Sequence, residues 1–167
     1  MRTPSIRSRV LLFRLHSRLD NAVMHPLPHH YIVSASASVS GRVELQSPGL
    51  PALESDPPTE FGGSGDCWSP ETLLTAALVD CFVLSFRAVA AASRFDWTRL
   101  ECRAEGTLDR IERVTQFTAF TVHARLSLSP DADQDRARKL LEKAEQVCLI
   151  SSSLKASKHL EMEIIAG

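Results

Sequence analysis

The pattern of apolar and polar residues predicts strands at both ends of the chain and a long helix between them. Apolar or small side chains alternate with polar ones from His30 to Val39, which is typical of a half-buried strand. A second short strand is expected over residues 43–47, and the turn signal Ser47-Pro48-Gly49 ends it. Residues 55–68 hold two prolines and three glycines, so we expect a loop there.

The longest apolar stretch of the sequence begins at Ser69-Pro70, which is a helix-start signal. Serine can cap the free amides of the first turn, and proline costs nothing at the first helical position. From Leu73 to Ala92 the predicted helix is apolar on nearly all sides, with charges only at Asp80 and Arg87. Such a helix lies in a protein core or spans a membrane. The many alanines, the two charges and the flanking strand patterns favour a core helix, so we expect no membrane partner.

The last third of the chain repeats both kinds of pattern. Alternating segments over residues 100–108 and 114–128, joined by residues 109–113, predict a β-hairpin. A second helix is expected after Ser129-Pro130-Asp131, with a buried stripe at Ala137, Leu140, Leu141, Ala144, Val147 and Cys148. A short helix over residues 151–158 and a strand over residues 160–165 follow. Strands grouped around helices predict an α+β fold with an antiparallel sheet around the long central helix.

Composition narrows the class of protein. A chain of 167 residues, 44% apolar and 23% charged, can bury the core of one globular domain. A net charge of −1 supplies no basic surface for phosphates, so no nucleic-acid partner is expected. The four cysteines have no C-x-x-C or zinc spacing, and His25, His29 and His30 have no further ligand nearby. We therefore expect no metal and no cofactor, and a reducing, cytoplasmic location.

The first 28 residues differ from the rest. Five arginines precede the first acidic residue, Asp20, and the apolar run over residues 10–13 is too short for a secretory signal. We interpret residues 1–28 as a disordered tail or as an upstream start with translation beginning at Met24, and a mitochondrial transit peptide stays open as an alternative. The folded domain is expected over residues 29–167.

Cys81 and Cys148 carry the strongest chemical signal. Cys81 lies three turns into the predicted long helix, and Cys148 lies at the last turn of the second helix. Two thiols in such positions suggest a pair that meets in the fold. A thiol pair is a redox device, because a thiolate is the nucleophile and a second thiol can resolve its oxidised form. Cys102 alternates with core positions and is interpreted as packing. Cys67 is either a bystander or an additional redox-active thiol.

Taken together, these segments resemble the OsmC/Ohr family, the osmotically inducible protein C and organic hydroperoxide resistance proteins. The resemblance covers residues 29–166 and rests on four motifs: Gly41-Arg42, Phe61-Gly62-Gly63, Pro70-Glu71 with Cys81 ten positions after the glutamate, and Val147-Cys148. It implies an OsmC-like fold, an intertwined homodimer and a thiol-dependent peroxidase for organic hydroperoxides, with a dithiol or lipoylated protein as reductant. It also implies that Cys81 is the peroxidatic thiol, that Cys148 resolves it, and that Arg42 and Glu71 activate it.

The implied chemistry constrains the geometry. A cation such as Arg42 would lower the pKa of Cys81, and Glu71 would hold the guanidinium by a bidentate pair. Glu71 and Cys81 lie ten residues apart on one predicted helix, which is about 15 Å of rise. One arginine cannot reach both side chains of a single straight helix. The spacing therefore favours a site shared between two subunits.

Some features depart from the family pattern or stay open. Leu149 follows the second cysteine where many family members have proline, and residues 43–61 form a long insertion next to the expected pocket. Phe61 and Trp68 are candidates for an apolar substrate pocket, although plain packing explains them equally well. Two alternatives to a peroxidase remain: an OsmC-like protein that binds an apolar small molecule, and a redox sensor without efficient turnover.

Overall fold

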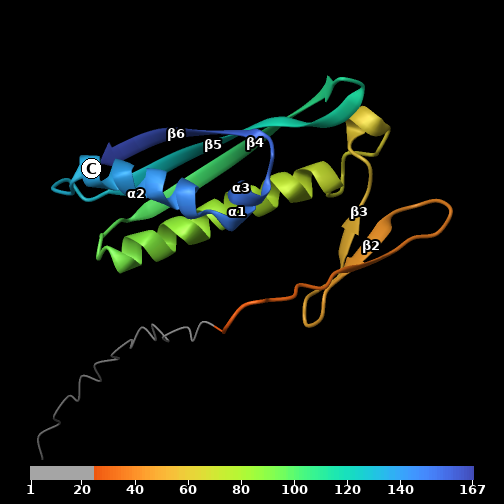
Figure 1. Ribbon diagram of the computed structural model, residues 1–167, viewed down its shortest axis with the longest axis horizontal. Helices are drawn as coiled ribbons and strands as arrows, with labels where there is room; N and C mark the ends of the chain where they lie inside the picture. Colours follow the sequence, from red (N-terminus) through yellow and green to blue (C-terminus); the bar gives the residue numbers. More distant parts are fainter. Residues whose placement is uncertain (1–24) are drawn as a thin grey trace, which may run out of the picture. The chain divides into compact units, whose positions relative to one another are not determined.

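The structure, a computed structural model, describes residues 25–167 (Figure 1). The interpretations of residues 1–28, namely a disordered tail, a start at Met24 or a transit peptide, lie outside the described residues as far as they concern residues 1–24. The chain divides into two units, residues 1–32 and residues 33–167, and the second unit holds all helices and strands that the structure describes. The predicted domain start at residue 29 stays a prediction.

A small antiparallel sheet forms the beginning of the second unit. It has the order β1-β2-β3, with β1 over Ser34–Ser36, β2 over Val43–Gln46 and β3 over Leu53–Ser55. The alternation over residues 30–39 gives only the three residues of β1, and all three are exposed. β3 was not predicted, because three residues are too few to show an alternation. The insertion over residues 43–61 is thus two paired strands followed by the 3-10 turn η1, Thr59–Phe61.

The predicted central helix is confirmed as α1, Pro70–Ala92. It begins where the sequence indicates, since Ser69 and Thr72 exchange side-chain and backbone hydrogen bonds in a capping box. Within the single chain one stripe is buried, made of Leu78, Phe82, Phe86 and Ala90 at intervals of four residues. Leu84 on another side is 51% exposed. The chain by itself therefore leaves much of the apolar helix uncovered.

α1 also has the length and composition of a membrane span, the one such helix in the part of the chain that the structure describes. Its mean hydropathy over 18 residues is 1.9, and 22% of that stretch is buried in the single chain. Core helices of globular proteins can have the same length and apolar composition. α1 packs against α2 (Gln134–Val147) and β4 (Arg99–Ile111), which is the environment of a core helix.

The second sheet has the order β4-β5-β6, with β5 over Val114–Leu128 and β6 over Ser157–Ala166. The predicted hairpin of β4 and β5 is confirmed, and its turn residues Glu112 and Arg113 have φ of 49° and 71°, as a tight two-residue turn requires. β6 differs from the expected all-antiparallel sheet, because it pairs parallel to β5. A helical crossover separates these two strands, which is the connection that parallel pairing needs.

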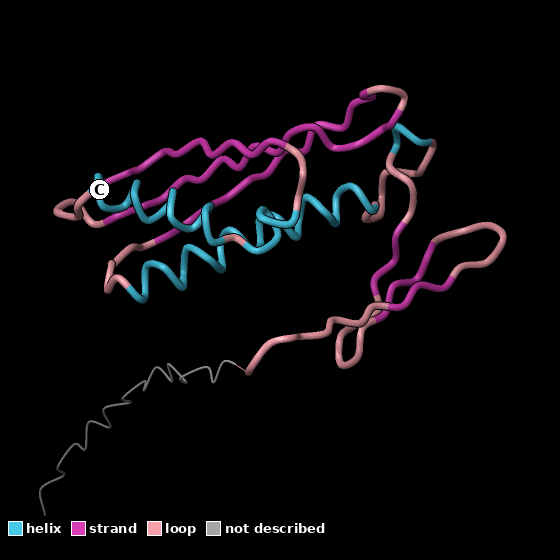
Figure 2. Tube along the Cα trace, in the orientation of Figure 1, coloured by secondary structure: helices cyan, strands magenta, loops and turns pink. Residues whose placement is uncertain are grey.

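The helices α1, α2 and α3 (Leu149–Ser153) cover one face of this second sheet (Figures 1 and 2). The core lies between the two layers, and its large fully buried side chains are Leu78, Phe82, Phe86, Phe120, Leu126, Leu128 and Leu141. Cys148 lies at the junction of two helices, because it is both the C-cap of α2 and the N-cap of α3. The short helix predicted over residues 151–158 therefore begins and ends earlier, and β6 begins at Ser157 rather than at residue 160.

Candidate functional site

The two thiols singled out in the sequence meet in the structure. Cys81 lies in the middle of α1 and is partly buried, and Cys148 at the start of α3 is 1% exposed. The two thiols lie close enough for each to change the pKa of the other. The backbone N–H of Ser151 also donates to the sulfur of Cys148, at 3.5 Å. The turn between α2 and α3 thus holds one thiol against the other.

The environment of Cys81 favours its thiolate. Burial alone raises the pKa of this thiol, but hydrogen bonds to the sulfur outweigh burial and lower its pKa below the usual 9.0. The donors are the backbone N–H of Ile150, the thiol of Cys148, the backbone N–H of Leu149 and the hydroxyl of Ser85. Two of these donors are amides of the first turn of α3, which have no partners inside a helix.

The thiols of Cys148 and Cys102 have the opposite property. Burial raises the pKa of Cys148 to about 11, and its hydrogen bond to Cys81 adds to the rise. Burial likewise raises the pKa of Cys102 to about 11. Because the thiolate is the reactive form, these opposite pKa directions make Cys81 the more readily ionised thiol of the pair. This order agrees with the roles that the family resemblance implies, and Cys102 behaves as a packing residue.

These pKa directions predict an ordered alkylation. At neutral pH iodoacetamide should label Cys81 before Cys148 and Cys102, and labelling of the latter two should rise only as the pH approaches 11. Ser85→Ala removes one donor to the thiolate, so the profile of Cys81 should move to higher pH. Mass spectrometry of labelled peptides measures each site, and Ser93→Ala at the far end of α1 is the control. An unmoved Cys81 profile in Ser85→Ala would contradict the assigned hydrogen bond.

Arg42 has different partners from the one expected. Its guanidinium donates to Glu54 at 2.8 Å and to Asp66 at 2.7 Å. The hydrogen bond to Glu54 and the charge of Asp66 raise the pKa of Arg42 above its usual value. The expected pairing of Arg42 with Glu71 is therefore not formed within one chain. The reason is the unpredicted strand β3, which places Glu54 next to the start of β2.

Glu71 has an unusual environment in the first turn of α1. Its Oε2 atom is buried and is the one such side-chain atom without a hydrogen-bond partner among residues 25–167. A carboxylate oxygen shielded from water without a donor is costly. Within one chain neither Glu71 nor Arg42 reaches Cys81, so the predicted four-residue constellation is incomplete in a single subunit.

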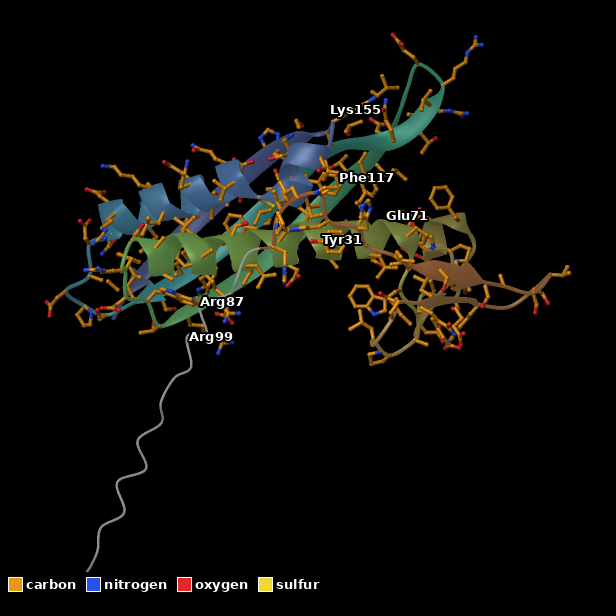
Figure 3. The ribbon with its side chains drawn as sticks, turned by 60° about the horizontal axis from the view of Figure 1, so that its bottom comes forward. Tyr31, Glu71, Arg87, Arg99, Phe117 and Lys155 are labelled. Atoms are coloured by element: carbon orange, nitrogen blue, oxygen red, sulfur yellow. The ribbon has the colours of Figure 1, made fainter. Side chains whose placement is uncertain are left out.

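Next to Glu71 lies a cavity of about 400 Å³. Its walls come from the loop before α1, the first turns of α1, and the β4–β5 hairpin: Pro58, Glu60, Phe61, Ser69, Glu71, Thr72, Thr75, Gly106, Leu108 and Phe117 (Glu71 and Phe117 are labelled in Figure 3). Phe61 thus lies in the wall of an apolar cavity, as expected for a substrate-pocket residue. Trp68 does not line this cavity, and lies instead beside a hollow formed with Asp66 and Cys67.

The structure adds residues that the sequence reasoning missed. Ser85 follows Cys81 by one helical turn, so its position on the same face of α1 was a usable signal. The amides of Leu149 and Ile150 had no sequence signal, because they act only once α3 starts at Cys148. Phe117 was also missed, since the simple alternation along residues 114–128 places it away from the core face.

Comparison with known proteins agrees with this architecture. Residues 63–163 match the family described as OsmC-like protein. The organic hydroperoxide resistance protein of Xanthomonas axonopodis pv. citri (strain 306) is 28% identical over 127 residues, 74% of this chain and 85% of that protein. The uncharacterized protein YmaD of Bacillus subtilis (strain 168) is 28% identical over 109 residues, 64% of this chain and 73% of YmaD. The crystal structure of an organic hydroperoxide resistance protein OsmC from Legionella pneumophila has a TM-score of 0.67 at 25% identity, over 84% of this chain and 99% of that one.

Proposed function

The chain belongs to the OsmC-like protein family, and on this basis we propose that it is a thiol-dependent peroxidase that reduces organic hydroperoxides to alcohols. The observation that carries the proposal is the contact between Cys81 and Cys148, whose pKa values are moved in opposite directions. Relatives named organic hydroperoxide resistance proteins support a peroxide-related role.

The first step of the proposed reaction oxidises Cys81. Its thiolate attacks the terminal oxygen of the hydroperoxide, the O–O bond breaks, and the alkoxide leaves as an alcohol after taking a proton. The sulfur loses two electrons and becomes a sulfenic acid, Cys81–SOH. Donors that stabilise the thiolate, such as the amides of Leu149 and Ile150, keep the nucleophile in its reactive form.

The second step involves Cys148, which already touches Cys81. Its sulfur attacks the sulfenic sulfur, the S–O bond breaks, and the oxygen leaves as water with the thiol proton. The product is a Cys81–Cys148 disulfide. An external dithiol or a lipoylated protein then returns both thiols by exchange and takes the oxidation as its own disulfide. We keep the expected cytoplasmic location as part of this proposal, because such recycling needs a reducing compartment.

We further propose that the working unit is a homodimer with two shared sites. In this arrangement Glu71 and Arg42 of one subunit lie beside Cys81 of the other, which completes the set that one chain leaves apart. Two observations support it: the buried Oε2 of Glu71 lacks a donor, and α1 leaves apolar surface such as Leu84 uncovered. Sedimentation at micromolar concentration should give twice the mass of one chain. A purely monomeric protein that is fully active would contradict the shared site.

The direct test of the proposed function is a steady-state assay. Reduced protein with cumene hydroperoxide and dihydrolipoamide should consume the peroxide catalytically, and hydrogen peroxide should be a poorer substrate because it cannot use the apolar cavity. Absence of turnover together with tight binding of the alcohol product would favour the alternative of a binding protein. A single oxidation that no dithiol reverses would favour a redox sensor.

A further inference from the structure

A β-bulge next to the cavity brings two aromatic rings onto the same side of the sheet. Phe117 and Phe120 are three residues apart in β5, and in a regular strand they would point to opposite faces. The pairing of β4 with β5 shifts between Thr107 and Leu108, where Thr107 pairs with Ala119 but Leu108 pairs with Phe117. Because the alternation is interrupted there, the two rings stack on each other, with centroids 4.8 Å apart and planes inclined by 27°.

Gly106 provides the space for this stack. It pairs directly with Phe120 across the hairpin, and it lines the cavity together with Phe117. A Cβ atom at position 106 would lie 2.8 Å from Cε1 of Phe117 and 2.8 Å from Cε1 of Phe120. Such contacts are closer than side chains tolerate, so both rings lie against bare backbone.

The two rings differ in how freely they could move if a side chain were added at position 106. Phe120 is 1% exposed and is packed into the core, whereas Phe117 is half-buried and borders the cavity. A side chain added at position 106 would therefore displace Phe117 toward the cavity, because the close-packed core resists movement of Phe120. Gly106 and Phe117 together therefore determine how far the Phe117 ring, the aromatic wall of the cavity, projects into the cavity.

We propose that Phe117, seated on Gly106 by the bulge, is the specificity-determining wall of this cavity and limits the proposed reaction to hydroperoxides with a compact aryl or branched alkyl group. This inference rests on the proposed function, since Glu71 on the same cavity is the residue that the dimer brings to Cys81. The volume of about 400 Å³ lies near the lower end of the range for small-molecule sites. The Phe117 ring is apolar and is supported by the Phe120 ring and the Gly106 backbone, so the cavity favours compact groups that fill it over long acyl chains.

The test uses two variants that move the wall in opposite directions. The measured quantity is kcat/KM for linoleic acid hydroperoxide divided by kcat/KM for cumene hydroperoxide. Phe117→Ala widens the cavity and should raise this ratio about tenfold or more, the size of effect that a pocket side chain has on discrimination. Gly106→Ala pushes Phe117 inward and should lower the ratio. Phe117→Leu is a smaller change and should raise the ratio by an intermediate amount. This variant keeps the test valid if Gly106→Ala folds poorly.

The matched control is Ile111→Ala, which changes an apolar residue of β4, the strand of Gly106. Ile111 is 46% exposed and is not among the residues that line the cavity. Its ratio should equal that of the unaltered protein. A ratio that stays within about twofold in both Phe117 variants would overturn the assignment of the wall.

A second readout does not depend on turnover. Calorimetry with 2-phenyl-2-propanol, the alcohol formed from cumene hydroperoxide, should show weaker binding to Phe117→Ala and unchanged binding to Ile111→Ala. If neither the unaltered protein nor any variant reduces hydroperoxides but the binding changes in this way, the peroxidase proposal fails and the role of Phe117 as the cavity wall stands. If turnover is normal and neither the ratio nor the binding changes, the cavity wall fails and the peroxidase proposal stands.

Discussion

Cys81→Ser is expected to remove the reduction of organic hydroperoxides altogether, with a loss of at least about a thousandfold in kcat/KM. The hydroxyl of serine is nearly the size of the thiol but is not ionised at neutral pH, so the donors around position 81 have no thiolate to stabilise. The measurement is the assay with cumene hydroperoxide and dihydrolipoamide.

The control for this variant is Cys102→Ser in β4. This thiol is partly buried, burial raises its pKa to about 11, and it belongs to the side chains packed against the core. Its replacement should leave the rate nearly unchanged, although it can reduce stability. If Cys81→Ser kept the normal rate while circular dichroism showed both variants folded, the assignment of the nucleophile would be wrong.

Cys148→Ser should separate the two steps of the reaction. The first oxidation of Cys81 is expected to proceed, because the thiolate still has the amides of Leu149 and Ile150 and the hydroxyl of Ser85 as donors. The disulfide cannot form, so the sulfenic acid should persist and react with dimedone. Mass spectrometry of peptides should find nearly complete dimedone addition at Cys81, against little addition in the unaltered protein.

The unaltered protein supplies the comparison for Cys148→Ser. After peroxide treatment its peptides under non-reducing conditions should contain the Cys81–Cys148 disulfide within one chain. Cys67 is the informative alternative, since it lies in the loop near Arg42 and its thiol donates to the carbonyl of Glu54 at 2.9 Å. A disulfide between Cys81 and Cys67 in the unaltered protein would reject the resolving role of Cys148.

Features specified by local chemistry could be predicted from the sequence. The start of α1 at Ser69-Pro70 follows from capping, and the β4–β5 hairpin follows from two alternating segments and a short connection. The direction of β6 could not be predicted in this way, because pairing depends on how α2 and α3 carry the chain back across the sheet. Strand periodicity identifies a strand but not its neighbour.

The candidate site likewise contains one feature that the sequence predicts and others that depend on the tertiary structure. The pairing of Cys81 with Cys148 was expected from their positions on two helices, and the structure brings the two together. The surroundings of Arg42 were not predictable, since Glu54 became its partner only through the three-residue strand β3. The position of Phe117 beside Phe120 was not predictable, because one bulge interrupts an alternation that the sequence alone suggests is continuous.

The uncovered side of α1 has a consequence for how stability must be measured. A surface that associates only in the folded chain couples folding to protein concentration by mass action. In the homodimer proposed above, the midpoint of thermal unfolding should rise as the protein is concentrated, and dilution should lower it as a destabilising substitution does. Substitutions on the uncovered side, such as at Leu84, would change this concentration dependence, whereas substitutions at the buried Phe86 would lower the midpoint at every concentration.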